Sequence, residues 1–502
     1  MNPTHPTTLL WFRKGLRLHD SPALHAALEQ EGPLCPVFIL DPELTRPEKL
    51  GINRMAFLLG TLSALHKELR ARGSRLFVLR GEPLSQLEWV MKTWKVDRLV
   101  FEFDTEPYAV RRDESARALA RRLGAEVISP GGHTLYDPGV LLQAAGGTLP
   151  TTYGGFQKLL ARVGEPAAPL STPAKLPPIP VSDLLNSSGP NSSAPDFGVP
   201  TLLELGYSGE ARGLTFCRPG EVAALEQMRA WTANPQRVAA FEKPSTDPSS
   251  YAPAATTRLS AHLKFGSLSS RTFYHTLRAA EREAGPHSQP PMSLVGQLLW
   301  REMFTTLGAA IPNYDRMVGN GLCRQIPWDD DPGLLEAWNT GQTGYPWIDA
   351  AMRQLEQEGW MHHLARHSVA CFLTRGDLWQ SWEAGQATFD RLLIDADWSV
   401  NAANWMWLSA SAFFTAYERV YSPVAFAKKY AGAKDYIRHY LPQLERMPDK
   451  FILEPWTAPL EVQRQAECVI GRDYPFPIVD HAAARERNLT RMKAAYAAGR
   501  VS

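Results

Sequence analysis

Short, mostly apolar runs alternate with amphipathic stretches along the first 130 residues of the chain. The runs that have the length of strands are residues 8–12, 34–40, 75–79, 99–103 and 126–128. Amphipathic stretches such as 53–72 and 109–123 lie between them, which is the pattern of βαβ units. Because the runs are apolar at successive positions, we expect strands buried on both faces of a parallel sheet. The pattern predicts a doubly wound, Rossmann-like α/β domain over residues 1–135, with a crevice at the carboxyl edge of its sheet.

The hydrophobic periodicity changes after about residue 220. From there apolar residues recur at helical spacing almost throughout, with Pro and Gly as punctuation. This predicts a large all-α domain over residues 220–495 and a short tail at 496–502. Residues 136–219 are the expected interdomain linker. Its Pro/Ser-rich part, 165–200, has nine prolines in thirty-six residues, a composition that buries too little apolar surface to order itself.

Composition and charge exclude several classes of protein. The five cysteines form no CxxC pair, which argues against a disulfide framework and a thiolate zinc site and favours a reducing compartment. No basic leader precedes a long apolar run, and no stretch reaches eighteen apolar residues. We expect a soluble, intracellular, monomeric protein without a membrane partner, nuclear in a eukaryote and otherwise cytoplasmic. No GxGxxG segment opens the first helix, so a nicotinamide dinucleotide site is not supported there.

Tryptophans crowd one part of the helical region. Ten of the fifteen lie between Trp300 and Trp407, and the same span contains Trp360-Met-His-His-Leu-Ala-Arg-His. Tryptophan commonly fills a core or anchors an interface singly, so such a crowd suggests that it surrounds something. Residues 360–372 are predicted to form a buried helix, on which His363 and His367, four residues apart, project from one face.

Arg366, on the same predicted helix, also faces the interior. A buried guanidinium needs a carboxylate partner, and Asp395 and Asp397 are available. Three interpretations are then open: satisfied core histidines among space-filling tryptophans, a metal site of two histidines and a carboxylate, or an organic redox cofactor packed among aromatic rings. The metal interpretation lacks an HExxH motif and a third ligand at a familiar spacing, so we predict no metal.

Basic and aromatic residues interleave in residues 426–440. A +1 net charge neither predicts nor excludes a nucleic-acid partner, so the local pattern matters. Lys428, Lys429 and Arg438 would contact phosphates while the tyrosines stack on bases. The alternative is a solvated helical face whose tyrosines turn inward.

Several long segments resemble the photolyase and cryptochrome family. They are Leu9-Leu-Trp-Phe-Arg-Lys-Gly-Leu-Arg-Leu-His-Asp, Gly296-Gln-Leu-Leu-Trp-Arg-Glu, Thr343-Gly-Tyr-Pro-Trp-Ile-Asp-Ala-Ala-Met-Arg-Gln-Leu, the histidine segment above, and Asp395-Ala-Asp-Trp-Ser-Val-Asn-Ala-Ala-Asn-Trp-Met-Trp. The similarity spans nearly the whole chain apart from the linker. It implies FAD in the all-α domain, and in the α/β domain an antenna chromophore of the 8-hydroxy-5-deazaflavin or folate type, or none.

The resemblance also implies roles for single residues around the flavin. Asn401 would face flavin N5, where an amide can donate or accept a hydrogen bond. Asp397 would lie at the pyrimidine edge of the ring, and Arg301, His363 and the Arg366–Asp395 pair would line it. The pyrophosphate would be held at a helix start by Thr256, Thr257, Leu259 and Ser260.

By the same resemblance, four tryptophans form an electron path. Trp405 would be nearest the flavin, Trp382 next and Trp328 near the surface, with Trp379 as a fourth member. Trp379 and Trp382, three residues apart, would share a helical face. Trp300 would line the substrate pocket, and the remaining tryptophans would mainly fill the core.

Gln297, His363 and His367 resemble the (6-4) photolyase and animal-type cryptochrome branches, whereas cyclobutane-dimer branches typically have Glu, Asn and Met there. This implies repair of UV-damaged double-stranded DNA with a flipped lesion, driven by electron transfer from excited reduced flavin. His363 would donate a proton, with His367 as its partner. The alternative is a blue/red-light photoreceptor that signals through a protein partner, alone or together with repair. The short segment after residue 481 favours repair.

Overall fold

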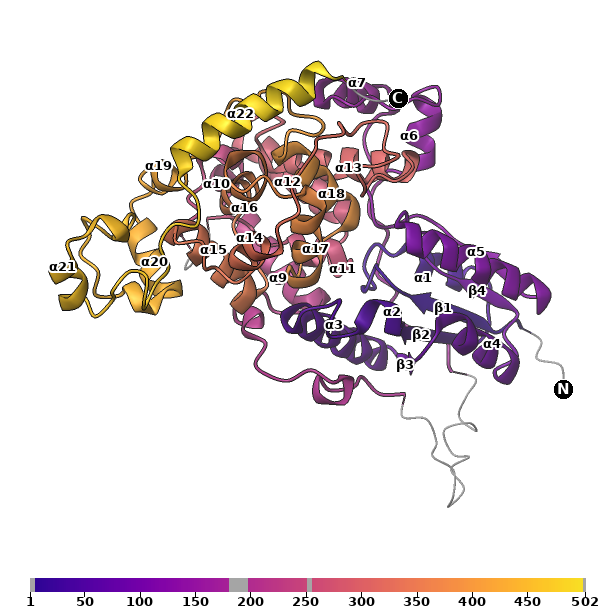
Figure 1. Cartoon of the computed structure of the whole chain (residues 1–502). Coiled ribbons are helices and arrows are strands. Elements are labelled where there is room, and N and C mark those ends of the chain that lie inside the picture. The colour runs from indigo at the N-terminus through magenta and orange to yellow at the C-terminus, as the bar shows by residue number, and fades with distance from the viewer. Residues whose placement is uncertain (1–4, 180–196, 251–254, 500–502) are drawn as a thin grey trace. The chain divides into compact units, whose positions relative to one another are not determined.

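The N-terminal part of the computed structural model, which describes residues 5–179, 197–250 and 255–499, is built on one parallel sheet (Figure 1). Its five strands stand in the order β3-β2-β1-β4-β5. The strands are β1 (Thr8–Phe12), β2 (Leu34–Leu40), β3 (Phe77–Arg80), β4 (Arg98–Val100) and β5 (Glu126–Ile128). Every residue of β1 and β2 is buried, as expected of central strands with continuous apolar runs. The predicted doubly wound α/β fold is confirmed.

Several helices around this sheet begin at a capping residue that is followed by proline. Ser21, Asp41 and Asp137 each accept a backbone N–H of the first helical turn, and a proline follows each of them. These signals fix where the chain leaves its strands and enters its helices. The helices are α1 (Pro22–Leu28), α2 (Pro42–Thr45), α3 (Ile52–Ala71), α4 (Pro83–Thr93), α5 (Pro107–Arg122), α6 (Pro138–Ala144) and α7 (Tyr153–Val163).

The rest of the chain is mostly helical, as predicted. The longer helices bury one face and place polar residues on the other, whereas α18 is apolar nearly all round. They are α9 (Glu221–Thr232), α10 (Pro235–Ala239), α11 (Ser260–Phe265), α12 (Ser270–Ala284), α13 (Leu294–Ala310), α14 (Pro332–Asn339), α15 (Pro346–Glu358), α16 (His363–Cys371), α17 (Trp382–Leu392), α18 (Trp398–Leu408), α19 (Pro423–Ala427), α20 (Ala433–Tyr440), α21 (Leu460–Gln465) and α22 (His481–Ala497).

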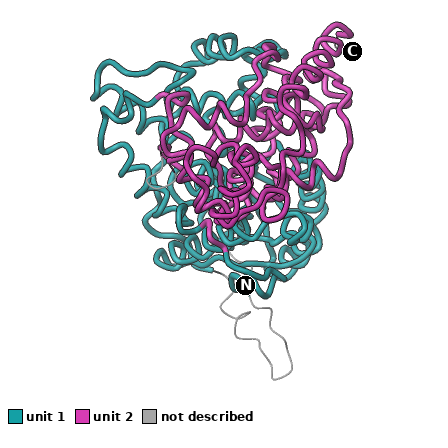
Figure 2. Tube along the Cα trace, turned by 60° about the vertical axis from the view of Figure 1, so that its left-hand side comes forward, with its two compact units in different colours: residues 1–210, 214–241, 259–309 teal, residues 211–213, 242–258, 310–502 magenta. Residues whose placement is uncertain are grey.

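The contacts of the chain divide it into two compact units (Figure 2). The first holds residues 1–210, 214–241 and 259–309, and the second holds 211–213, 242–258 and 310–502. Helices α9 to α13 thus group with the sheet, although the sequence places them in the all-α domain. The units divide the chain by contacts only, so the predicted domain boundaries stay predictions. Residues 180–196 of the predicted Pro/Ser-rich segment and 500–502 of the tail lie outside the described residues.

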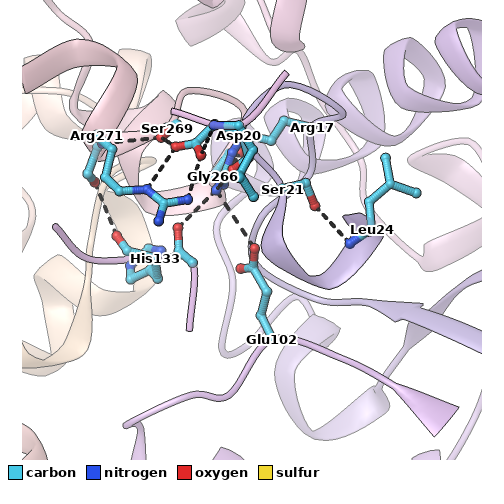
Figure 3. Close-up of polar contacts among 12 residues, drawn as sticks. Arg17, Asp20, Ser21, Leu24, Glu102, His133, Gly266, Ser269 and Arg271 are labelled. Atoms are coloured by element: carbon cyan, nitrogen blue, oxygen red, sulfur yellow. Dashed lines mark hydrogen bonds and ion pairs between the residues drawn. The ribbon is translucent and has the colours of Figure 1, made fainter. Parts of the chain in front are cut away.

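A buried polar network explains this grouping (Figure 3). Arg17, which follows β1, donates to the carbonyl of Gly266 at 3.0 Å and to that of Gly132 at 2.9 Å. Asp20 accepts from Arg271 Nε at 3.1 Å and from the hydroxyl of Ser269. The loop after the first strand is therefore bonded to the start of α12 through groups that burial would otherwise leave unpaired.

Candidate functional site

Helix α16 carries the predicted histidine pair but starts later than the sequence suggests. His362 is in extended backbone, and its ring Nδ1 accepts the N–H of Leu364 at 3.1 Å, so it caps a helix that begins at His363. The prediction of a helix from residue 360 is therefore wrong at its start, because the cap replaces the first turn. His363 and His367 do share a face, with ring centroids 5.9 Å apart.

A third histidine and a lysine, both missed in the sequence, join the pair. The ring of His362 lies 4.3 Å from that of His363, centroid to centroid. Lys243 acts on the pKa of all three histidines, and the ring of Tyr421 lies 6.3 Å from that of His367. Lys243 lies in a short Lys-Pro-Ser turn more than a hundred residues from α16, so no local spacing could have indicated it.

Burial, and after it the charges around these histidines, favours the neutral imidazole. Burial, followed by the charge of Lys243, holds the pKa of His363 well below its usual range and lowers that of His367 to about 3. Burial, followed by the charge of Arg366, lowers the pKa of His362 to about 3 and that of Lys243 to about 8. The imidazolium expected for proton donation therefore requires a negative charge that compensates this cationic cluster.

The predicted Arg366–Asp395 ion pair is present. Arg366 Nη2 lies 2.9 Å from Asp395 Oδ2, and its Nε donates to the carbonyl of Met361 at 2.9 Å. The Asp395 side chain is 5% exposed, and its Oδ1 has no hydrogen-bond partner among the described residues. A buried carboxylate oxygen left in this state costs free energy unless a ligand donates to it.

Asn401, on α18, has only half of its amide available to a ligand. Its Nδ2 donates to the carbonyl of Gln386 at 3.2 Å and to Asp390 Oδ1 at 2.8 Å, which uses both amide hydrogens. The carbonyl oxygen is therefore the atom that can meet a ligand, and it can only accept.

The buried groups left unpaired suit a polar heterocycle. Among the described residues, His363 Nε2, Gln386 Oε1 and Asp395 Oδ1 are buried without a hydrogen-bond partner. They combine donors and acceptors on α16, on α17 and before α18, in the aromatic part of the second unit. An isoalloxazine ring, with ring nitrogens and carbonyls along one edge, offers the complementary groups. The residues present therefore fit a flavin.

Other predicted site residues lie in the first unit, mainly on α13. Gln297 Nε2 donates to the carbonyl of Pro291 at 2.8 Å, and the ring of Trp300 packs 4.3 Å from that of Tyr153. Arg301 Nη1 donates to the carbonyl of His133 at 2.9 Å. Their assigned roles stay predictions.

The predicted pyrophosphate residues lie around the start of α11. This helix begins at Ser260, which is exposed, and its N-cap is the buried Leu259. Thr256 and Thr257 are half-buried and belong to the second unit. Their contact with a pyrophosphate stays a prediction.

The two tryptophans predicted to lie nearest the flavin are buried on adjacent helices. Trp382 opens α17 and is fully buried, and Trp405 on α18 is 1% exposed. A Cβ on Gly385 would lie 2.2 Å from Trp405 Cη2, so glycine is required there for α18 to approach α17. Since Trp382 and Gly385 are three residues apart on α17, Trp382 and Trp405 lie on facing surfaces of the two helices.

The other two tryptophans of the predicted path, Trp328 and Trp379, differ from the prediction in one respect. Trp379 and Trp382 do not share a helical face, because Trp379 lies before α17 with a φ of +56°. The backbone N–H of Trp379 donates to the carbonyl of Thr374, and the backbone carbonyl of Trp379 accepts from the N–H of Asp329. These bonds place the Trp379 ring against Trp328, with centroids 4.8 Å apart.

The basic segment is largely neutralised by acids of the same chain. Lys428 pairs with Glu454 at 2.9 Å, and Arg438 pairs with Asp449 at 2.6 Å. Lys429 lies over the ring of Phe426 at 5.8 Å. The rings of Tyr436 and Tyr440 are buried, which matches the inward-facing alternative and removes them from stacking on bases. Contacts of Lys428, Lys429 and Arg438 with DNA stay predictions.

Within residues 5–179, 197–250 and 255–499, no three His, Cys, Asp or Glu side chains are grouped so that they could hold a metal ion. None of the described helices combines the length and the apolar character needed to cross a bilayer.

Comparison with known proteins agrees with the geometry. Residues 294–494 match the family model described as the FAD binding domain of DNA photolyase, and residues 8–175 match the one described as DNA photolyase. A (6-4)DNA photolyase of Oryza sativa subsp. japonica is 47% identical over 99% of this chain and 91% of its own length. Cryptochrome-2 of Gallus gallus is 45% identical over 97% and 83%.

A solved bacterial class III photolyase from Agrobacterium tumefaciens has 30% identity and a TM-score of 0.82, covering 99% of both chains. The identity to the relatives over nearly the full length, the parallel sheet and the helical part with a flavin-compatible cluster lead to one conclusion: the chain belongs to the photolyase and cryptochrome family and carries its FAD-binding domain.

Proposed function

We propose that this protein repairs (6-4) pyrimidine–pyrimidone photoproducts in UV-damaged double-stranded DNA, using blue light absorbed by FAD. The observation that carries the proposal is the grouping of His362, His363 and His367 with Lys243 beside the partly buried Arg366–Asp395 ion pair. This cluster joins proton-transfer groups to a flavin-compatible site. The similarity to a protein named (6-4)DNA photolyase supports it.

Bound FAD, in its reduced form, supplies the electron when light excites it. The Arg366–Asp395 pair would help to orient the ring, because Asp395 Oδ1 can accept a hydrogen bond that nothing described in the chain donates. Asn401 presents an oxygen that can only accept, and this suits a protonated N5 better than an unprotonated one. The Asn401 contact therefore favours the reduced state that repair needs.

The histidines obtain their proton when DNA binds. A phosphate or an electron-rich lesion near Lys243 compensates the cationic charge that, after burial, most disfavours the His363 imidazolium. The pKa of His363 then rises toward the pH of the solution, and the ring can hold and deliver a proton. The proton-donating state is thus coupled to substrate binding, with His363 as donor and His367 as its partner.

The DNA contacts are proposed for two sets of residues. Gln297 and Trp300 contact the flipped lesion, and Gln297 offers its Oε1 because its Nε2 is held by Pro291. The phosphate backbone of the DNA contacts Lys428, Lys429 and Arg438. Lys428 and Arg438 would exchange their carboxylate partners for DNA phosphates. Their net contribution to the free energy of DNA binding is therefore smaller than that of an unpaired cation.

An antenna chromophore of the deazaflavin or folate type would meet paired charges at the carboxyl edge of the sheet. Lys14, after β1, lies 2.9 Å from Asp104, and Arg13 pairs with Asp113. A chromophore at this switch point has to pack around these pairs or replace their partners. Fluorescence of pigment released from the purified protein identifies which of the two types, if either, is bound.

The second candidate is a photoreceptor that signals through a protein partner, supported by the 45% identity to cryptochrome-2 of Gallus gallus. Light-dependent repair decides between the candidates. The reduced protein is illuminated with an oligonucleotide containing one (6-4) photoproduct and, in parallel, with one containing a cyclobutane dimer. Loss of only the (6-4) photoproduct is expected. Loss of only the cyclobutane dimer would contradict the branch assignment, and loss of neither would favour the photoreceptor.

A variant separates the histidine role from flavin binding. His363→Ala should abolish repair while the protein retains its FAD, measured by flavin absorbance after gel filtration. Trp405→Phe is the matched control, because it should slow photoreduction of the flavin and leave repair by prereduced protein largely intact.

A further inference from the structure

Two residues in the segment that follows α18 have a strained backbone. Ala410 and Phe413 have φ values of +58° and +63°, in the left-handed region that residues with a Cβ rarely adopt. Such conformations persist only where surrounding contacts determine the course of the backbone. Residues 409–417 therefore keep their shape through contacts with other parts of the chain.

Arg375 holds both ends of this segment. The side chain is 1% exposed, its Nε donates to the carbonyl of Leu408 at 2.9 Å, and its Nη1 donates to the carbonyl of Tyr417 at 2.8 Å. The guanidinium carbon also lies 5.6 Å from the centroid of the Phe414 ring, within the segment. A planar guanidinium presents separate N–H groups at fixed angles, so it can bond two carbonyls at once.

Arg375 also continues a row of side chains on α16. His363, His367 and Cys371 are four residues apart on one face of this helix. Arg375 follows four residues after Cys371, in the π turn that extends the helix. A Cβ on Gly376 would lie 2.6 Å from the carbonyl oxygen of Cys371, so glycine is required for the turn to pack against the end of α16. The histidine pair and the arginine that holds the segment therefore lie on one continuous element.

Tyr421 lies across this row, four residues after Tyr417. The centroid of its ring is 6.3 Å from that of His367. Burial raises the pKa of the Cys371 thiol, whereas the charge of Arg375 and the backbone N–H of Tyr421 lower it. Burial likewise raises the pKa of Tyr421, and the charge of Arg375 lowers it. Arg375, Cys371 and Tyr421 are therefore neighbours, and Tyr421 covers the Cys371 end of the histidine face.

We infer that Arg375 is a positioning residue that places Tyr421 over the histidine pair. By holding both ends of residues 409–417, it sets the course of the chain into Tyr421, whose ring then keeps water from His367 and Cys371. Arg375 acts only through Tyr421, since its own hydrogen bonds go to backbone carbonyls. The inference rests on the proposed function, because repair is what gives the histidine pair a task that depends on its surroundings.

The first test measures how well Tyr421 covers Cys371, without any photochemistry. All five cysteines are buried, so iodoacetamide alkylates each of them only when the structure around it opens. In Arg375→Gln, Cys371 should be alkylated about tenfold faster than in the wild type, as mapped by mass spectrometry of the peptides. Cys35, in β2, should keep its wild-type rate. An unchanged rate for Cys371 would overturn the inference.

Arg375→Lys separates the geometry of the side chain from its charge. Lysine keeps the positive charge but has a single nitrogen, which cannot reproduce the two bonds made by Nε and Nη1. Cys371 should therefore be alkylated as fast in Arg375→Lys as in Arg375→Gln. A wild-type rate in Arg375→Lys would mean that the charge suffices, and the role of the two hydrogen bonds would be wrong.

Arg17→Lys is the matched control. Arg17 is also 1% exposed and bonded to backbone carbonyls, those of Gly266 and Gly132, but it belongs to the first unit. Its replacement should lower the Tm, as the Arg375 variants do, and leave the alkylation of Cys371 unchanged. Equal acceleration in the Arg17 and Arg375 variants would reflect general destabilisation and contradict the inference.

Tyr496→Phe decides the case if the Arg375 variants do not fold. The hydroxyl of Tyr496 donates to the carbonyls of Ala410 and Phe414, at 2.7 Å and 3.3 Å, so its loss loosens the same segment from another side. Cys371 should be alkylated severalfold faster in this variant. Unchanged alkylation would overturn the inference, and so would a wild-type Cys371 that reacts as fast as in the urea-unfolded protein.

The second test separates turnover from binding during repair. With reduced protein under blue light, Arg375→Lys should lower kcat for the (6-4) photoproduct by about tenfold, because the histidine pair loses its cover. KM and the FAD content should stay unchanged, because Arg375 bonds only within the chain. A wild-type kcat would contradict a role of Arg375 in repair. If the wild type repairs nothing, the proposed function fails, while the alkylation rates still decide whether Arg375 places Tyr421.

Discussion

We expect His362 to make the folded protein sensitive to mild acid. The side chain is 1% exposed, its Nε2 has no hydrogen-bond partner among the described residues, and burial lowers its pKa to about 3. The unfolded chain binds a proton at a pKa of about 6.5, so the unfolded state takes up the proton first as the pH falls. Stability contributed by the neutral ring is therefore complete above pH 6.5 and decreases below it.

The magnitude follows from the difference between the two pKa values. Between pH 7 and pH 5 the free energy of unfolding should fall by about 2 kcal/mol because of His362 alone, at roughly 1.4 kcal/mol for each pH unit below 6.5. The decrease continues until the pH reaches the folded pKa, near 3. Two kcal/mol is a large part of the 5–15 kcal/mol that stabilises a typical domain.

His362→Asn isolates this contribution. Asparagine is a good N-cap, so it can replace the ring nitrogen that accepts the N–H of Leu364 and leave α16 intact. Urea unfolding of the wild type and the variant at pH 7, 6 and 5 gives the difference in stability at each pH. Between pH 7 and pH 5, the free energy of unfolding of the variant should rise by about 2 kcal/mol relative to that of the wild type. A constant difference across this range would refute the assignment of a buried, neutral His362.

Three further changes test the site. Arg366→Leu leaves Asp395 buried without its cation and should cost about 3–5 kcal/mol of stability, measured by urea unfolding; Arg366→Leu combined with Asp395→Leu should recover most of it. Gly385→Ala should cost about 1–3 kcal/mol, because its Cβ would lie 2.2 Å from Trp405 Cη2, and calorimetry should show a lowered Tm. Lys243→Met should weaken binding of damaged DNA and reduce the slope of log affinity against log salt by about one, and an unchanged slope would exclude a phosphate contact.

The α/β part was predictable because its information is local. Continuous apolar runs imply strands buried on both faces, and the observed β1 and β2 match the predicted bounds. The predicted runs 75–79, 99–103 and 126–128 overlap β3, β4 and β5 in the structure. The His363–His367 face was predictable for the same reason, since four residues make about one helical turn.

The predictions failed where a local rule was applied across a break in the helix. Trp379 and Trp382 have helical spacing, but the chain leaves the helix at Gly376 and Trp379 adopts a positive φ. The hydrogen bonds that hold Trp379 involve Thr374 and Asp329, and the second is fifty residues away. Spacing alone does not contain such a contact.

The sequence by itself determined the sheet, the helical half, the shared face of the histidines and the residue types available to a flavin. The tertiary structure decided which charges meet. It brought Lys243 to α16, stacked Arg491 on Trp379, and paired Lys428 and Arg438 with acids of the same chain. The physical reason is that periodicity records which side of its own element a residue faces, whereas pKa values and the energy of a charge depend on residues that packing brings together from distant parts of the chain.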